Sequence, residues 1–327
     1  MNRSQLNWGL LSTARINKDV IPAIYASKRS RLLAVGSRSQ DSAAQYAAEW
    51  HIPQPYGDYD SLLADPQVDV IYISLPNHLH AEWTVKALHA GKHVLCEKPL
   101  AQTMAEMEAI EAAAHETGRM VAEAFMYRHH PQTLKVKEML DSGQLGRLQF
   151  VRGAFSYTLT RKENFRADPG RGGGSIWDIG CYPISYARML AGFEPVEAFG
   201  WQVEGPTGID ESFIGQMRFP ESVHAQFDCG FKAPPRAQME VVGTEGALFV
   251  PSPYKPGHGE EITWRHGRHV EKVKMPGREL YSGEVEDMVD AILEGKAPRI
   301  SLEDSRANLK AILALLESAR TGMPQMV

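Results

Sequence analysis

The stretch WGLLSTARIN, residues 8–17, is a short apolar run followed by a turn of small side chains. Ser12, Ala14 and Asn17 have the spacing of the glycines in G-x-G-x-x-G, which joins a first strand to a helix in dinucleotide-binding domains. Serine and alanine are the smallest replacements for glycine, a serine hydroxyl can donate to phosphate, and the following N–H groups would lie at a helix N-terminus. Asn17 predicts a slightly displaced helix, or one that Asn17 caps. The cofactor contacts expected here are Ser12, Thr13, Ala14 and Ile16.

The segment from residue 6 to residue 97 alternates short apolar runs with stretches of helical periodicity. The runs are apolar on both faces, as in a parallel sheet that helices cover on both sides. Regular alternation of strand and helix indicates right-handed βαβ units and an α/β fold with a doubly wound Rossmann sheet. The expected strands are 6–11, 31–35, 68–75, 93–96 and 120–124, and the expected helices are 20–26, 42–50, 61–63, 81–90 and 104–117.

In several stretches beyond residue 125 apolar and polar residues alternate, which is typical of antiparallel strands with one exposed face. We expect a dinucleotide-binding domain over residues 1–124 and a substrate-binding and oligomerisation α+β domain over residues 125–327, with a large, mainly antiparallel open sheet. The C-terminal helix is expected to pack back on the first domain. A second subunit should cover the open face, giving a homodimer or higher homo-oligomer. The expected strands are 148–157, 196–203, 213–219, 224–231 and 237–242, and the expected helices are 284–294 and 302–321.

Composition excludes several classes of function. The 327 residues carry a formal net charge of −5, and the Lys and Arg residues are scattered, so neither nucleic acid nor a membrane surface is an expected partner. No apolar run has the length of a membrane span or the form of a signal peptide. Cys96, Cys181 and Cys229 stand singly in apolar runs, which favours reduced thiols and a cytoplasmic location.

The end of the second expected strand, GSRSQ (residues 36–40), predicts the cofactor. In this fold an acidic residue here accepts from the ribose 2′-hydroxyl, whereas arginine favours a 2′-phosphate. Ser37 and Arg38 stand there, and no carboxylate occurs before Asp41. Because a planar guanidinium suits phosphate, we expect NADP, with NAD as the alternative. An arginine at a strand end can also be an ordinary solvated residue.

Two further strand ends hold candidate catalytic residues, ISLPNHLH (73–80) and HVLCEKPL (93–100). Ligands of open α/β sheets bind beyond the carboxyl ends of the strands, so both stretches should face one crevice. Lys98, beside Glu97, is either half of a surface ion pair or a functional lysine with a shifted pKa. His78 and His80 lack a third ligand at a fitting spacing, and no metal is expected.

Four stretches together resemble the Gfo/Idh/MocA oxidoreductase family. LCEKPL (95–100) is similar to its E-K-P motif and GGGSIWDIGCYPI (172–184) to its D-x-G-x-H/Y signature, and the resemblance includes EAFMYRHHP (123–131) and SARTG (318–322). The resemblance implies two domains and a nicotinamide cofactor that oxidises or reduces a carbon bearing oxygen, most often in a sugar or cyclic polyol. Tyr182, where many members have histidine, is similar to the branch that contains glucose–fructose oxidoreductase, dihydrodiol dehydrogenase and NADP-dependent aldose dehydrogenase.

The resemblance implies a role for each matching residue. Lys98 would be the catalytic lysine, Glu97 would orient it, and the bond before Pro99 would be cis. Asp178 would bind substrate hydroxyls, and Tyr182 would handle the proton. A phenol with its usual pKa near 10 is a poor base at neutral pH, and a lysine close by would lower that pKa by favouring the phenolate. The alternative is that the Tyr182 ring simply packs in the core.

Further contacts follow from the same resemblance. The glycine run at residues 172–174 is expected to let backbone pack close to the cofactor. The residues expected near the cofactor are Leu75, Asn77, His80, Glu97, Lys98, Arg128 and Trp177. The residues expected to bind substrate are Lys98, Arg166, Asp178 and Tyr182.

The sequence thus predicts an NADP-dependent dehydrogenase or reductase of an aldose-like sugar or a cyclic diol, with oxidation of C1 to a lactone as the expected reaction. Two alternatives stay open. One is a redox-neutral glycosidase that keeps NAD bound, against which Arg38 argues. The other is a sensor that binds NADPH and does no chemistry, in which Lys98 or Tyr182 would be missing.

Overall fold

A computed structural model describes residues 4–160 and 164–327 of the chain. Contacts divide the chain into two compact units. The first consists of residues 1–126 and 281–305, and the second of residues 127–280 and 306–327. The chain therefore returns to its first unit after most of the second is built. The division into domains of residues 1–124 and 125–327, expected from the sequence, stays a prediction.

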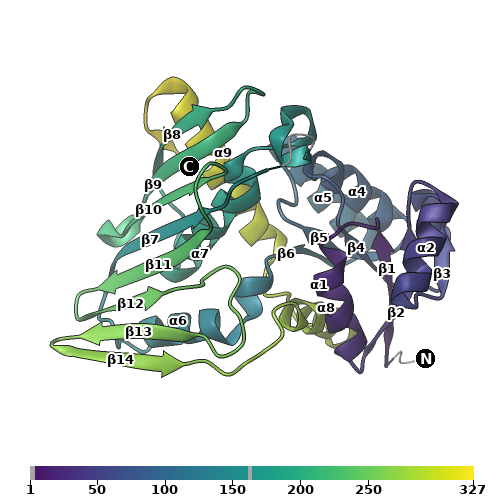
Figure 1. Cartoon of the computed structure of the whole chain (residues 1–327), viewed down its shortest axis with the longest axis horizontal. Helices are drawn as coiled ribbons and strands as arrows, with labels where there is room; N and C mark the ends of the chain where they lie inside the picture. Colours follow the sequence, from purple (N-terminus) through teal and green to yellow (C-terminus); the bar gives the residue numbers. More distant parts are fainter. Residues whose placement is uncertain (1–3, 161–163) are drawn as a thin grey trace. The chain divides into compact units, whose positions relative to one another are not determined.

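The first unit is built on a six-stranded sheet in the order β3-β2-β1-β4-β5-β6 (Figure 1). All of its neighbouring strands are parallel, which confirms the doubly wound α/β fold. The strands are added in one direction from β1 to β3 and in the opposite direction from β4 to β6, so the parallel strands β1 and β4 end side by side where the order reverses. The strands are β1 (Leu6–Leu11), β2 (Ser30–Gly36), β3 (Gln54–Tyr56), β4 (Val70–Ile73), β5 (His93–Glu97) and β6 (Val121–Ala124), and the helices are α1 (Asn17–Ala26), α2 (Gln40–Trp50), α3 (Tyr59–Ala64), α4 (His80–His89), α5 (Met104–Thr117) and α8 (Ser282–Glu294).

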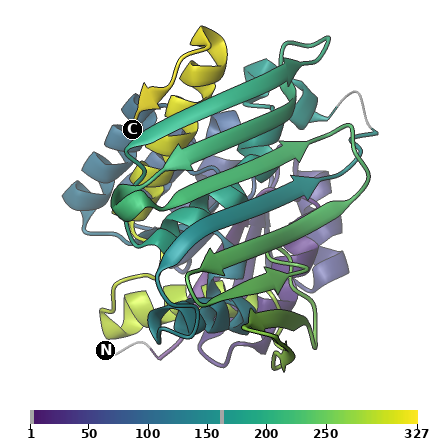
Figure 2. The ribbon, with the colours of Figure 1, turned by 90° about the vertical axis from the view of Figure 1, so that its left-hand side faces the viewer.

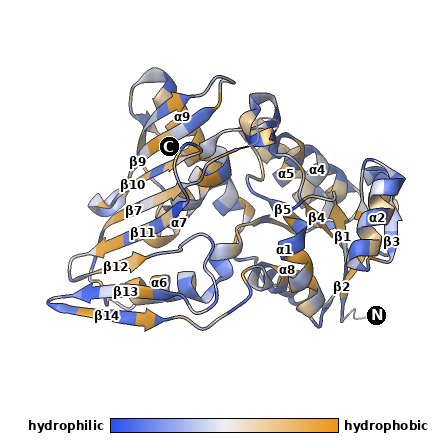
Figure 3. Cartoon of the chain, in the orientation of Figure 1, coloured by the Kyte–Doolittle hydropathy of each residue, from blue (hydrophilic) through white to orange (hydrophobic). Residues whose placement is uncertain are grey.

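Local chemistry explains these elements. Every residue of β4, VIYI, is buried, and Trp8 and Leu10 of β1 are 0% exposed, as a sheet covered on both faces requires. At α5, Thr103 and Glu106 form a capping box, and Gly118 ends the helix with a φ of +63°. Figure 3 shows the mainly apolar colouring of the central strand β1.

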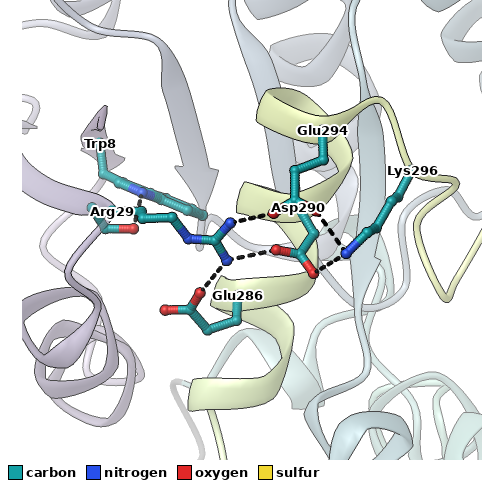
Figure 4. A network of polar contacts seen from close by, with 7 residues as sticks. Trp8, Arg29, Glu286, Asp290, Glu294 and Lys296 are labelled. Carbon is teal, nitrogen blue, oxygen red and sulfur yellow. Dashed lines mark hydrogen bonds and ion pairs between the residues drawn. The ribbon is translucent and has the colours of Figure 1, made fainter. Parts of the chain in front are cut away.

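One arginine holds helix α8 to the start of β2. Arg29 pairs with Glu286, Asp290 and Glu294, on successive turns of α8, at 2.7, 2.5 and 2.7 Å (Figure 4). Lys296 pairs with Asp290 at 3.1 Å and with Glu294 at 2.8 Å. Helix α8 also lies against α1. These contacts explain why the segment belongs to the first unit although it follows most of the second in the chain.

The second unit is built on a nine-stranded sheet in the order β14-β13-β12-β11-β7-β10-β9-β8-β15, seen face-on in Figure 2. Neighbouring strands are antiparallel except β7 and β10, which are parallel. The expected large, mainly antiparallel sheet is thus confirmed. The strands are β7 (Leu148–Ser156), β8 (Glu197–Glu204), β9 (Asp210–Arg218), β10 (His224–Gly230), β11 (Arg236–Gly243), β12 (Gly246–Val250), β13 (Glu261–His266), β14 (His269–Lys274) and β15 (Gln325–Met326), and the main helices are α6 (Pro131–Asp141), α7 (Cys181–Ala191) and α9 (Leu302–Thr321).

Helix α9 packs on one face of this sheet because two glycines make room for it. A Cβ at Gly200 would lie 2.9 Å from Leu315 O, and one at Gly215 would lie 3.0 Å from Leu315 Cδ2. Gly200 N also donates to Ser318 Oγ at 3.1 Å. The next residue along β8, Trp201, is 54% exposed, so the opposite face of the sheet has no cover within this unit at that position.

The sequence analysis does not predict β12, β13, β14, α6 or α7. Strands β13 and β14 form a hairpin, and five of the six residues of β14, HVEKVK, are exposed. Its colouring in Figure 3 is largely hydrophilic. Backbone pairing of the two strands holds this hairpin together, and Glu261 forms an ion pair with Lys274 across it. Because β14 is mostly exposed, its sequence has no alternation of apolar and polar residues from which a strand could be predicted. Within the described parts of the chain, no helix combines the length and apolar character needed to cross a bilayer.

Candidate active site

The turn after β1 keeps the conformation of a glycine turn. Ser12 has a φ of +133°, which side chains rarely adopt and glycine adopts readily. Its Oγ accepts from Ala14 N at 3.1 Å and lies 2.8 Å from Ser74 Oγ. Asn17 donates from Nδ2 to Ser12 O at 2.8 Å, and its Oδ1 accepts from Ser74 Oγ at 2.7 Å. Ser12, Ser74 and Asn17 thus form a closed, buried ring of hydrogen bonds.

This ring explains what the glycine replacements do. The Ser74 hydroxyl donates to Asn17, so the hydrogen shared between the two serines comes from Ser12. The Ser12 hydroxyl therefore donates within the protein, and its expected donation to phosphate stays a prediction. The capping alternative for Asn17 is wrong, because the N-cap of α1 is Ile16 and no side chain caps it. Asn17 instead ties the turn to the end of β4.

The end of β2 presents one exposed cation. Ser37 is buried, and its N donates to Tyr56 O at 2.9 Å, which fixes the strand end against β3. Arg38 follows and is exposed, just before Ser39, whose Oγ caps α2 by accepting from Ser42 N at 3.3 Å. An exposed guanidinium beside a helix N-terminus is a favourable place for an anion. The roles of Ser37 and Arg38 in cofactor binding stay predictions.

His80 joins two strand-end loops of the first unit. Its Nδ1 lies 2.7 Å from Pro99 O and its Nε2 lies 2.7 Å from Leu75 O. The ring is 1% exposed, and burial lowers the pKa of the imidazole although both hydrogen bonds favour its protonated form. The polar atoms of His80 therefore hold the loops after β4 and β5 together. Leu75 and Asn77, also buried, lie on the first of these loops.

The E-K-P turn, residues 97–99, is held on both sides. Tyr72 Oη, on β4, donates to Glu97 Oε1 at 2.5 Å. Leu100 N donates to Glu123 Oε1, on β6, at 2.9 Å. The Lys98–Pro99 bond is cis, as the sequence motif implies. The turn that carries Lys98 is thus held by two buried polar side chains, Tyr72 on β4 and Glu123 on β6.

Glu284, on α8, is a buried acid that the sequence analysis does not find. It is 2% exposed, and among the described residues neither of its carboxyl oxygens has a hydrogen-bond partner. Burial, and then the charge of Glu97, raise the pKa of Glu284 well above its usual value. This shift favours the neutral form of the Glu284 carboxyl.

In the second unit, Asp178 lies in a π-helical turn, Ile176–Gly180, directly before α7. Such turns are frequent at functional sites. Arg166 Nε lies 2.8 Å from Asp178 Oδ1, as an ion pair. Tyr157 Oη donates to Asp178 Oδ2 at 2.7 Å. Burial, and then the Asp178 charge, raise the pKa of Tyr157, so this phenol stays protonated and keeps donating.

Tyr182 lies at the start of α7 within an aromatic cluster. The centroid of its ring lies 5.5 Å from that of Phe155, 5.7 Å from that of Tyr127 and 5.8 Å from that of Tyr254. The residue is 4% exposed. The cluster fixes the plane of the ring, which a proton-handling phenol also needs, so packing by itself does not decide the role of Tyr182.

Arg128 and Trp177 flank the same helix. Arg128 is 7% exposed and donates from Nη1 to Ser185 Oγ, on α7, at 3.0 Å. Tyr127 Oη donates to the same oxygen at 3.0 Å. Trp177 is 9% exposed and immediately precedes Asp178. Both residues are thus fixed to the segment that carries Tyr182, and their contact with a cofactor stays a prediction.

The glycine run permits close approach within the protein. A Cβ at Gly173 would lie 2.5 Å from Arg166 O, and one at Gly174 would lie 2.2 Å from Asp210 Oδ1. Gly174 also has a φ of +127°. These glycines therefore serve the packing of Arg166 and Asp210 against the Asp178 turn. The expected packing of the glycine run against the cofactor stays a prediction.

The expected site residues fall on both units: those between Ser12 and Lys98 on the first, and Arg128, Arg166, Trp177, Asp178 and Tyr182 on the second. Sequence reasoning missed Ser74, Tyr157, Asp210 and Glu284. Each belongs to a segment distant from the motif it supports, and no spacing rule connects them. The turn chemistry of Asn17 was the one available signal, since asparagine side chains readily bond to nearby backbone.

These features define a class of protein, an oxidoreductase with a Rossmann unit and a second unit built on a large open sheet. Residues 6–125 match the family model described as the GFO/IDH/MocA oxidoreductase family with an NAD-binding Rossmann fold, and residues 133–249 match the GFO/IDH/MocA C-terminal domain. The chain therefore belongs to the Gfo/Idh/MocA oxidoreductase family, as its motifs predict.

Three relatives illustrate the likeness. The chain is 35% identical to D-xylose 1-dehydrogenase (NADP(+)) 2 of Haloferax volcanii, over 96% of this chain and 98% of that one. It superposes on the aldose-aldose oxidoreductase of Caulobacter crescentus, complexed with glycerol, with a TM-score of 0.92 at 26% identity, covering 99% and 100% of the two chains. It superposes on KijD10, a 3-ketoreductase of Actinomadura kijaniata in complex with NADP and TDP-benzene, with a TM-score of 0.91 at 28% identity, covering 96% and 98%.

Proposed function

We propose that this protein transfers a hydride between NADP and a carbinol or carbonyl carbon of a sugar, with oxidation of an aldose at C1 to a lactone as the principal reaction. The observation that carries this proposal is the buried Asp178 carboxylate, held by Arg166 and Tyr157 in the turn that precedes Tyr182. A fixed, buried carboxylate is a strong acceptor for sugar hydroxyls. A cyclic diol offers the same donors and is the second substrate class to test.

The turn after β1 fits a dinucleotide. The positive φ of Ser12 reproduces the glycine conformation at the first fingerprint position, and Asn17 fixes the start of α1. Thr13, Ala14 and Ile16 would then lie along the pyrophosphate, and Arg38 would pair with a 2′-phosphate. When bound, the nicotinamide accepts or supplies the hydride. Leu75, Asn77, Arg128 and Trp177 are the proposed contacts of that half of the cofactor.

Side chains of the protein take up the proton of the substrate hydroxyl and stabilise the charge that develops on its oxygen. Hydride leaves a carbinol carbon readily only when the hydroxyl proton is removed in step, so the reaction needs a base and a positive charge. We assign the proton to Tyr182 and the positive charge to Lys98, which is carried on the turn that Tyr72 and Glu123 hold. Asp178 orients the sugar, and Arg166 pairs with that carboxylate.

The test is the absorbance of reduced cofactor with NADP and then NAD, over a panel of pentoses, hexoses, disaccharides and cyclic diols. Lys98→Ala and Tyr182→Phe should each lower kcat by about 10²-fold or more and leave the cofactor dissociation constant unchanged. The matched controls are Lys86→Ala, at an exposed position of α4, and Tyr186→Phe, one turn further along α7. Turnover that does not depend on Lys98 would contradict the proposal.

The alternatives are separated by the same measurements. The relatives described above are named as dehydrogenases and reductases, so a redox-neutral glycosidase and a sensor are not favoured. A cofactor retained through purification, together with sugar cleavage and no net reduction, would establish the glycosidase. Cofactor binding without turnover of any substrate in the panel would establish the sensor.

The outer face of the second unit's sheet supports a homodimer. Trp201 and Ile214 are directly paired across β8 and β9, and they are 54% and 48% exposed. Val203 is 64% exposed, and the Phe199 ring lies 4.3 Å from that of Trp201. We propose that a second copy covers this patch, because adjoining apolar side chains of this size are rarely left in water.

Sedimentation velocity tests the dimer. The wild-type protein should sediment as a dimer at micromolar concentration, and Ile214→Glu should shift it to a monomer. Tyr25→Glu, at an exposed tyrosine of α1, is the control and should leave the dimer intact. A monomeric wild-type protein would overturn the proposal.

We also place the protein in a reducing cytoplasm. Cys96, Cys181 and Cys229 are buried and form no disulfide, and burial raises the pKa of the Cys96 and Cys229 thiols. Cell fractionation tests this location directly.

A further inference from the structure

Asp210, the first residue of β9, reaches the start of the turn that carries Asp178. Its Oδ2 accepts from Ser175 Oγ at 2.6 Å and from Ile176 N at 2.8 Å. Ile176 begins the π-helical turn, and its N–H is one of the groups that a helix start leaves without an intrahelical partner. A carboxylate at this position both satisfies that donor and interacts favourably with the helix dipole.

The glycine before this turn is matched to the carboxylate. A Cβ at Gly174 would lie 2.2 Å from Asp210 Oδ1, and the φ of +127° at Gly174 is itself one that side chains disfavour. Gly174 N donates to Arg166 O at 3.0 Å, and Asp178 N donates to Gly174 O at 3.1 Å. One glycine therefore touches Asp210 and bonds to both partners of the Arg166–Asp178 ion pair.

Keeping Asp210 in this place costs stability. The residue is 6% exposed, and burial raises the pKa of its carboxyl to about 6, against the effect of its hydrogen bonds. The titratable groups that face it are Cys229, from β10, whose thiol pKa the Asp210 charge raises, and beyond that thiol Cys181 and Asp178. Burial of a carboxylate disfavours its ionised form, and such costs are typical of functional sites.

We propose that Asp210 is a positioning residue: by binding Ser175 and Ile176 it fixes the turn on which Asp178 meets Arg166 and Tyr157, and so sets the orientation of the substrate. This inference rests on the proposed function, in which Asp178 binds sugar hydroxyls. Asp210 acts only through the turn and does not touch the substrate itself.

The first test is independent of activity. Hydrogen exchange of the peptide that contains residues 176–180 is measured in wild type, Asp210→Asn and Asp210→Ala, with Glu211→Gln as the control. Glu211 is the next residue of β9, and its side chain pairs with Lys232 instead. Asp210→Ala should raise exchange in this peptide by about tenfold or more, because Ile176 N loses its acceptor. The asparagine variant retains an acceptor and should exchange less than the alanine variant. Wild-type exchange in Asp210→Ala would overturn the proposal.

The second test separates positioning from a general loss of structure. Asp210→Ala should raise KM for the sugar by about tenfold or more and leave the cofactor dissociation constant within about twofold, whereas partial unfolding would change both. Asp210→Asn should restore most of the loss. If the alanine variant does not fold, Ser175→Ala takes its place, because it removes one of the two bonds and should change KM in the same direction by less. An unchanged KM for the sugar in the variant that folds, Asp210→Ala or Ser175→Ala, would contradict the inference.

Failure of the proposed function gives a different result. If no sugar or diol is turned over by the wild-type protein, the oxidoreductase proposal fails, while the exchange of residues 176–180 still decides whether Asp210 holds the turn.

Discussion

Tyr72 Oη donates to Glu97 Oε1 at 2.5 Å, which joins a fully buried phenol on β4 to the residue before Lys98 on β5. Burial, and then the charges of Glu97 and Glu284, raise the pKa of Tyr72 well above its usual value. The phenol therefore stays protonated throughout the neutral range and donates a hydrogen bond to Glu97. Because β4 and β5 are neighbours, this bond fixes the two strand ends from which the Leu75 loop and the E-K-P turn begin.

Tyr72→Phe should lower the free energy of unfolding by about 2 kcal/mol, because it removes a buried hydrogen bond to a carboxylate and keeps the ring volume. Urea denaturation measures the change. Tyr25→Phe is the control, since Tyr25 also donates at 2.5 Å, to Trp50 O, but is 48% exposed; its effect should stay below about 0.5 kcal/mol. Equal losses in the two variants would show that burial of the Tyr72–Glu97 bond does not matter.

Arg38→Asp should reverse the preference for cofactor. A carboxylate in this place repels a 2′-phosphate and accepts from a ribose hydroxyl, so the ratio of kcat/KM for NADP to that for NAD should fall by about 10²-fold. Arg31→Asp, at an exposed position of β2, makes the same change of charge and should leave the ratio nearly constant. An unchanged ratio in Arg38→Asp would remove this residue from the site.

Arg29→Ala should destabilise the protein by about 1 kcal/mol, since its side chain is 34% exposed and solvent weakens each of its three ion pairs. The loss should shrink in high salt, which screens exposed charges. Urea unfolding at low and high ionic strength gives both values, with Arg31→Ala as the control. A loss that does not change with salt would mean that packing of the Arg29 stem, rather than its charge, holds α8.

Asp210 predicts a dependence of stability on pH. Its folded pKa of about 6 lies above the ordinary value of 3.8, so the folded state binds this proton more tightly than the unfolded state does. The stability that it contributes is complete below about pH 4 and is lost as the pH rises through about 6. Relative to Asp210→Asn, which does not titrate, wild-type unfolding free energy should fall by about 3 kcal/mol over that interval. Parallel curves for the two proteins would show that Asp210 is not perturbed.

Several features of this protein can be predicted from sequence because they depend on local chemistry. Continuous apolar runs separated by helical periodicity predict the parallel sheet, and Gly91, Gly118 and Gly322, each with positive φ, lie at the ends of helices. Ser301 caps α9, since its Oγ accepts from Asp304 N at 3.1 Å. The cis bond before Pro99 and the family motifs are equally local.

What the sequence by itself determined was therefore the fold class, the family and the residues that carry its motifs. Only the tertiary structure decided what supports them: Ser74 and Asn17 close the turn of Ser12, Tyr72 holds Glu97, and Asp210 holds the start of the Asp178 turn. The partners in each contact lie between 5 and 62 residues apart. Periodicity and capping rules reach only a few residues along the chain, whereas a buried polar group takes whatever partner the folded chain brings to it.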